Sequence, residues 1–155
     1  MDIDVPRPPL HTSHLVAVLH ETLPYPDRLG LERMQFPAMV RLGSALGLAN
    51  LGPDDMPGLL KLNSLRNRMA HVLDWEPDEK SELELFNSLS AKSRHSAFGE
   101  KTLKDYEFPE GMRHMIASLA MALEVTRERL IEYRAEMMAQ HQRVVKVLGF
   151  DSSHK

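Results

Sequence analysis

The segment LNSLRNRMAHVLDW, residues 62–75, places an arginine, an amide and a histidine within an apolar helical pattern. Histidine, here His71, exchanges protons near neutral pH. Arginine, here Arg66, presents a planar and permanently charged fork to phosphate oxygens. Asn67 lies one helical turn before His71, so its amide can hydrogen-bond to the imidazole and set its tautomer. These groups suit metal-free RNA cleavage, in which a 2′-hydroxyl attacks the adjacent phosphorus and the arginine offsets charge on the phosphorane.

The geometry of a helix limits which of these groups can act together. Asn63, Asn67 and His71 recur every four residues and form one polar row. Arg66 lies beside that row, but it is five residues from His71, which corresponds to roughly 140° around the axis. Two copies of the helix packed about a twofold axis would bring both arginines and both histidines into one cleft. We therefore expect a homodimer with a shared cleft.

The same pattern has a simpler interpretation. An arginine and a histidine on one helix are usually a solvated or interface pair with no catalytic role. The formal net charge is −3, whereas non-specific nucleic-acid binders usually carry a basic excess. An RNA contact must then come from a local basic patch, and composition alone predicts only a helical globular domain.

Apolar residues recur at helical spacing along most of the 155 residues, and strand patterns are almost absent. We expect an all-helical domain over residues 10–148, between an extended proline-rich lead-in (1–9) and a flexible tail (149–155). The expected helices are 10–22, 28–47 with a kink or split at Pro37, 55–73, 77–89 and a long C-terminal helix over 109–148. Residues 90–111 are expected to form a long polar loop.

The third of these helices should bury one apolar stripe, which consists of Leu59, Leu62, Leu65, Met69 and Val72. Trp75 follows at the expected helix end, where a tryptophan is usually a core or dimer-interface anchor. In the expected loop, Lys92, Arg94 and His95 form a basic segment. With Asn63 they are candidates for RNA contact, although such a segment is equally consistent with a solvated loop.

Several classes of site are excluded or disfavoured. The chain has no cysteine, so disulfides and thiolate metal sites are ruled out. His11 and His14 are three residues apart, but no third ligand follows at a convincing spacing, and we predict neither a metal nor a cofactor. The N-terminus lacks the pattern of a signal peptide, and the longest apolar run, 115–123, is too short to span a bilayer. We expect a cytoplasmic protein without a membrane partner.

RNRMAH, residues 66–71, matches the pattern R-N-x-x-x-H. This resembles the signature of the HEPN superfamily (higher eukaryotes and prokaryotes nucleotide-binding domains). The flanks are similar to small bacterial HEPN-like proteins as well: FPAMVRLGSALGL (36–48), a short turn, then GLLKLNSLRNRMAH (58–71). The resemblance is best over residues 10–75 and only architectural beyond them.

The resemblance implies a HEPN-like bundle of four to five helices, usually a homodimer whose motif helices face each other. Many members are metal-independent endoribonucleases in toxin–antitoxin or phage-defence settings. Carried over, Arg66 and His71 would be the catalytic pair and Asn67 the polar residue that follows the arginine. RNA would be the substrate, and an antitoxin or another protein would be a partner. Other members are non-catalytic interaction or regulatory modules.

Two positions depart from the family pattern. Leu73 stands where the toxin subgroup regulated by a nucleotidyltransferase has a tyrosine, which argues against that modification here. Many relatives carry a glutamate in the first helix that faces the motif. Here the first helix carries His14 and His20, and Glu21 only at its end. The resemblance then implies either a histidine in place of the glutamate or a weakened site.

Overall fold

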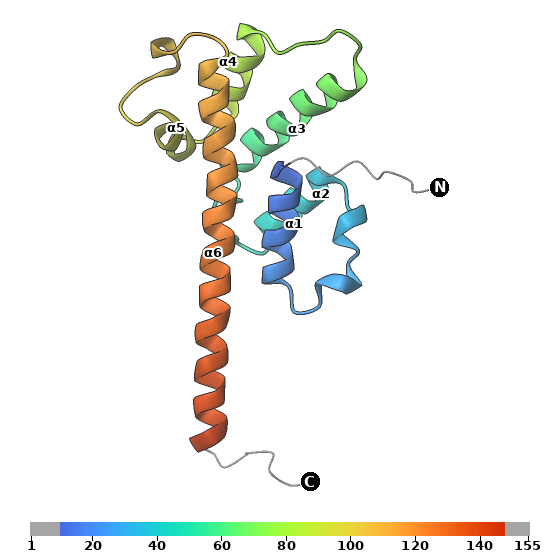
Figure 1. Cartoon of the computed structure of the whole chain (residues 1–155), viewed down its shortest axis with the longest axis vertical. Helices are drawn as coiled ribbons and strands as arrows, with labels where there is room; N and C mark the ends of the chain where they lie inside the picture. The colour runs from blue at the N-terminus through green and yellow to red at the C-terminus, as the bar shows by residue number, and fades with distance from the viewer. Residues whose placement is uncertain (1–9, 148–155) are drawn as a thin grey trace.

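The computed structural model describes residues 10–147, and the predicted lead-in (1–9) and tail (149–155) lie outside them. Among the described residues the elements are helices joined by turns and loops, with no strand, which confirms the all-helical prediction, but six α-helices are present where a bundle of four to five was expected. Three short 3₁₀ turns, η1 (Pro26–Arg28), η2 (Leu31–Arg33) and η3 (Leu103–Asp105), join the longer elements. The six α-helices are α1 (Leu10–Thr22), α2 (Phe36–Ala45), α3 (Met56–His71), α4 (Glu79–Ser88), α5 (Ala91–Phe98) and α6 (Glu110–Val147) (Figure 1).

The 38-residue helix α6 is the axis of the bundle. Helix α1 lies along its middle, and α4 and α5 surround its first turns (Figure 1). Helices α2 and α3 pack on each other, α2 also contacts α1, and α3 also contacts α4. The side chains that fill the centre are aliphatic and almost fully buried: Leu15, Leu19, Met39, Leu51, Leu59, Leu85, Met115 and Leu123. An apolar stripe on each helix therefore meets one common core.

A buried carboxylate fixes the start of α6. Glu82 of α4 is only 5% exposed, and its Oε1 accepts a hydrogen bond of 2.6 Å from the backbone N–H of Met112. The first N–H groups of a helix have no partner within the helix and lie at the positive end of its dipole, so a carboxylate is well placed there. Gly111 permits this approach, because a Cβ on that residue would lie 2.9 Å from Glu82 Oε1.

The first helix, the split of the second and the long last helix are confirmed. Helix α1 spans the predicted residues 10–22, and α6 ends within the described chain at Val147. The stretch predicted as one kinked helix over 28–47 is divided into turns and α2, with Pro37 in the first turn of α2, where a missing N–H costs little. Helix α4 begins at Glu79, two residues later than predicted.

The long polar loop predicted over 90–111 is wrong. Residues Ala91–Phe98 form α5, which packs on α6. Ser90 caps this helix by accepting a hydrogen bond from the backbone N–H of Ser93. Phe98 is buried against the rings of Phe86 and Tyr106, with centroids 5.8 and 5.4 Å away. The polar composition concealed a short helix that is held by one buried aromatic side chain and a cap.

The predicted core stripe of α3 is correct only for its first half. Leu59, Leu62 and Leu65 are buried, whereas Met69 and Val72 are 57% and 50% exposed. Helix α3 extends beyond the elements that cover its first half, as its upper end in Figure 1 shows. Its last turns therefore keep the helical pattern without a core to face.

The contact between Glu82 and α6 yields the first prediction. Glu82→Ala should lower the free energy of unfolding by about 2 kcal/mol, because the buried N–H of Met112 loses a charged acceptor. Glu82→Gln should lose less, since an amide oxygen can still accept. Urea denaturation followed by circular dichroism would measure both, with the exposed Glu100→Ala as the matched control. Equal stability of Glu82→Ala and Glu100→Ala would contradict this role.

Candidate functional site

Helix α3, which carries the motif, is anchored at its N-terminal end. Pro57 lies in its first turn, and Asp55 precedes it. Asp55 Oδ1 accepts hydrogen bonds of 2.8 and 3.2 Å from the hydroxyls of Ser90 and Ser93 at the start of α5. Gly58 lets α3 approach α4 closely, because a Cβ there would lie 2.8 Å from Leu89 Cδ2. The first half of α3 is therefore fixed by its neighbours on several sides.

The motif occupies the other half of α3, where the helix is open to solvent. Every residue from Arg66 to Asp74 is exposed, and α3 ends at His71. Among the described residues, the side chains of Arg66, Asn67 and His71 have no hydrogen-bond or ionic partner. The hydrogen bond expected between Asn67 and His71 is therefore not formed. All three predicted catalytic side chains remain available to a ligand or to another chain.

A surface groove lies between the motif side of α3 and the start of α2. Its volume is about 520 Å³. Arg66 and Asn67 line it together with Asn63, which is 8% exposed, and Arg41 from α2. Arg41 and Arg66 are the charged residues among its described lining, and neither is paired within the described chain. The full lining is Met34, Gln35, Phe36, Pro37, Ala38, Arg41, Asn63, Arg66 and Asn67.

This arrangement favours anions. Two unpaired guanidinium groups and three amides (Gln35, Asn63 and Asn67) supply donors that match phosphate oxygens, and no carboxylate belongs to the described lining to compete for them. Sequence reasoning missed Arg41, because FPAMVRLG gives no sign of chemistry. Only the packing of α2 on α3 places Arg41 beside Arg66.

His71 does not belong to this groove. It is the last residue of α3, five positions beyond Arg66, and it is absent from the described lining. The roughly 140° rotation expected for that spacing points it to a different side of the helix. One copy of the chain therefore gathers Arg41, Arg66 and Asn67 but leaves the histidine outside.

The neighbouring Arg68 and Trp75 form a structural contact. The Arg68 guanidinium carbon lies 4.5 Å from the centroid of the Trp75 ring, which is a cation–π distance. Trp75 is half-buried and packs against the core. This contact folds the chain back after α3, where Asp74 adopts a positive φ of 60°. Trp75 is therefore a core anchor, one of the two roles that the sequence left open.

The other predicted RNA contacts lie elsewhere, on α5. Arg94 donates from Nε to the carbonyl of Leu89 at 3.1 Å and lies 4.9 Å from the centroid of the Phe86 ring. Those contacts tie α5 to α4. His95 is exposed. Lys92 donates from Nζ to Asn50 Oδ1 at 2.7 Å. None of the three lines the groove that holds Arg66.

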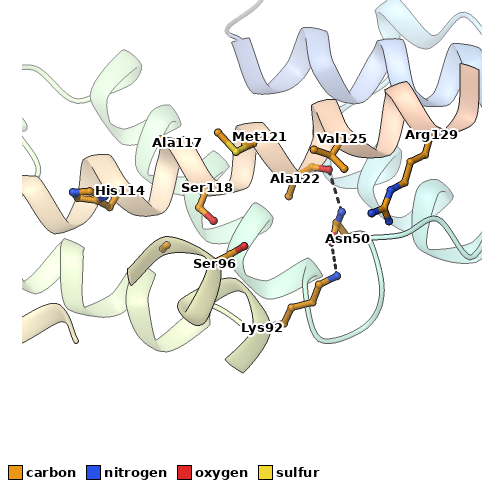
Figure 2. A pocket seen from close by; sticks show the side chains of 11 residues that line it. Asn50, Lys92, Ser96, His114, Ala117, Ser118, Met121, Ala122, Val125 and Arg129 are labelled. Atoms are coloured by element: carbon orange, nitrogen blue, oxygen red, sulfur yellow. Dashed lines mark hydrogen bonds between the residues drawn. The ribbon is translucent and has the colours of Figure 1, made fainter. Parts of the chain in front are cut away.

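Lys92 belongs to a second hollow, of about 440 Å³, between α5 and α6. Figure 2 shows Asn50 at one end of it, hydrogen-bonded to Lys92 and to the carbonyl of Ala122, with Arg129 beside it and His114 at the far end. Asn50 Nδ2 also donates to Thr126 Oγ1 at 2.9 Å. Asn50 thus joins the α2–α3 turn to α6, which gives this hollow a structural role.

The first helix faces α6. His14 Nδ1 lies 2.9 Å from Glu124 Oε2, and Glu124 also accepts from Arg127 at 3.0 Å. Glu21, the glutamate at the end of α1, accepts a hydrogen bond of 2.9 Å from Nη1 of Arg134. Neither His14 nor Glu21 lines the groove of Arg66. Both His14 and Glu21 are therefore engaged with α6 and not with the motif on α3.

Within residues 10–147, no group of three histidine, aspartate or glutamate side chains is placed to hold a metal ion. No helix of that range is long and apolar enough to cross a membrane. Comparison of the chain with protein-family models, with curated proteins and with solved structures finds no match.

The contacts of Arg94 yield a prediction that separates its two roles. Arg94→Ala should lower the free energy of unfolding by about 1 to 2 kcal/mol, because a backbone hydrogen bond and a stacked ring contact are lost. It should leave the affinity for a short RNA unchanged within a factor of two, by fluorescence anisotropy. The matched control is Arg113→Ala, an exposed arginine of α6. A large loss of RNA affinity with unchanged stability would instead support the predicted RNA contact.

Proposed function

We propose that this protein is a metal-independent endoribonuclease of the HEPN type, which acts as a homodimer in a toxin or phage-defence setting. The observation that carries the proposal is the groove of Arg41, Arg66 and Asn67, whose two arginines have no counter-charge in the described chain. Such a groove fits the phosphate of an RNA backbone. The R-N-x-x-x-H pattern supplies the histidine that the chemistry requires.

In the proposed reaction, His71 takes the proton from a 2′-hydroxyl. The 2′-oxygen then forms a bond to the adjacent phosphorus, and the bond from phosphorus to the 5′-oxygen breaks. Arg66, assisted by Arg41, stabilises the negative charge on the phosphorane, and His71 then gives the proton that it took up to the leaving 5′-oxygen. The products are a 2′,3′-cyclic phosphate and a 5′-hydroxyl, and DNA is resistant because it lacks the 2′-hydroxyl.

The histidine must come from a second copy. His71 lies outside the groove of its own chain, so a partner that faces α3 about a twofold axis supplies its own His71 to the first groove. Exposed apolar residues for such pairing lie within two residues of His71 in the sequence: Met69, Val72 and Leu73 are 57%, 50% and 90% exposed. Exposed aliphatic side chains that gather at one end of a molecule favour association.

The same apolar surface favours a second candidate function, a non-catalytic interaction or regulatory module. In that case Met69, Val72 and Leu73 bind another protein, such as an antitoxin, and the polar row is part of the interface. The two functions differ in one respect that can be measured, which is whether Arg66 and His71 are needed for cleavage.

The decisive experiment is cleavage of a mixed RNA pool by the purified protein in EDTA. Wild type should cleave and leave 2′,3′-cyclic phosphate ends. Arg66→Ala and His71→Ala should each lose at least about 100-fold in rate, and Arg41→Ala should lose less. Arg113→Ala serves as the matched arginine control. No cleavage by the folded wild type would favour the interaction module.

A mixing experiment tests the shared cleft directly. If Arg66 of one copy works with His71 of the other, a mixed dimer of Arg66→Ala and His71→Ala keeps one intact site. When equal amounts of the two variants are mixed and their subunits exchange, half of the dimers are mixed, and each mixed dimer has one intact site out of two. The mixture should therefore recover about a quarter of wild-type activity. If cleavage is seen for wild type but mixing restores none, the two residues act within one chain.

A further inference from the structure

The C-terminal half of α6 leaves the bundle. Figure 1 shows α6 continuing well past the end of α1 with no other helix beside it. Every residue from Ile131 to Val144 is exposed. In the described chain, Arg134 is the last residue of α6 whose side chain bonds another element, through the carbonyl and carboxylate of Glu21. Residues 131–147 are called the α6 extension below.

The α6 extension carries large apolar side chains that are exposed to solvent. Tyr133, Met138 and Val144 are 59%, 64% and 53% exposed, and Met137 is 46% exposed. A helix of this length without tertiary packing is marginally stable in water. The exposed apolar side chains therefore indicate that another helix covers this part of α6.

With the exception of Met138, these side chains have the spacing of a helix pair. Tyr133, Met137, Gln140 and Val144 follow one another at intervals of four, three and four residues, and Leu130, three residues before Tyr133, packs on the core of its own chain. Positions that alternate by three and four residues form the seam of a two-helix coiled coil. The seam has one polar member, Gln140, and such a residue restricts the register and orientation of the pair.

The charges beside the seam favour a second copy that runs in the opposite direction. Glu136 and Arg143 come just before Met137 and Val144, and Arg134 and His141 come just after Tyr133 and Gln140. Arg134 is bound to Glu21 of its own chain. In a parallel pair, Glu136 would face His141 of the partner subunit, and Arg143 would have no acidic partner within the extension. In an antiparallel pair, Glu136 faces Arg143 of the partner subunit, and the symmetry repeats this contact.

We propose that the α6 extension pairs with the same segment of a second copy as an antiparallel two-helix coiled coil. The twofold axis crosses between Met137 and Gln140, so that Met137 packs on Gln140 of the partner subunit and Tyr133 packs on Val144 of the partner subunit. The seam covers only a few helical turns, so the dimer dissociates on dilution.

This interface is separate from the α3 pairing in the proposed function and does not depend on it. An antiparallel pair of extensions places the two bundles at opposite ends of the seam, so their α3 helices do not meet. A chain that uses both interfaces forms assemblies larger than a dimer, because each copy then contacts one neighbour through α3 and a different neighbour through α6.

The first test reverses charges on the full chain. By analytical ultracentrifugation, Glu136→Arg and Arg143→Glu should each weaken the association at least tenfold, and the double variant should recover most of it. Glu132→Arg is the matched control, since it lies away from the seam and should associate as wild type does. The proposal would be overturned if each single variant associated as strongly as wild type, or if wild type stayed monomeric at every concentration. RNA cleavage by the same samples should be unchanged, which separates this interface from the site on α3.

The second test fixes the direction with disulfides, and it is simple because the chain has no native cysteine. Tyr133→Cys and Val144→Cys should form an intermolecular disulfide when the two proteins are mixed and oxidised. Neither should form one efficiently alone, since equal positions lie far apart in an antiparallel pair. Efficient crosslinking of each variant with itself would show a parallel pair, and no crosslinking in any mixture would exclude the pairing.

Discussion

The packing of α1, α4 and α5 against one long helix is the interaction on which the rest of the structure depends. Helix α6 supplies Met115, Leu119 and Leu123 to the core, and Glu82 fixes its first turn. Helices α2 and α3 are held mainly through α1, α4 and each other. The ends of α3 and α6 lie beyond these contacts, and they are exposed from Arg66 to Asp74 and from Ile131 to Val144.

Helix α3 is divided by this constraint into two halves with different tasks. Leu59, Leu62 and Leu65 bury one stripe and hold the helix in place, while Arg66 and the residues after it extend into solvent. A rigid helix that is anchored at one end can present side chains without the mobility of a loop. The unpaired guanidinium groups of Arg41 and Arg66 keep their charge available for a ligand. The guanidinium group of Arg68, two residues after Arg66 on the same helix, is instead held in a cation–π contact with the Trp75 ring.

Most of the helices could be predicted from the sequence, because their apolar periodicity and their prolines act locally. The bounds of α1 and the split before Pro37 are examples. The predictions that were wrong concerned features that depend on which other elements pack against a segment. Met69 and Val72 continue the apolar stripe of α3, but whether they are buried is decided by how far α4 and α2 reach along it. Helix α5 was missed because Phe98 is its sole fully buried member among many polar residues. The groove was predicted only in part, since Arg41 joins Arg66 through packing that no local pattern reveals.

The two exposed ends differ in charge, and this difference indicates different partners. The α6 extension has both signs in an order that its own antiparallel copy complements. The groove on α3 is cationic, so a twofold pairing there brings four arginines near one another and is opposed by their repulsion. Apolar contact through Met69, Val72 and Leu73 must overcome that cost, unless an anion shares the cleft. A polyanion that binds between two copies removes the repulsion, and by linkage it strengthens the dimer as the dimer strengthens its binding. Pairing through α3 and binding of RNA are therefore expected to be one coupled equilibrium, whereas pairing through α6 is independent of the ligand.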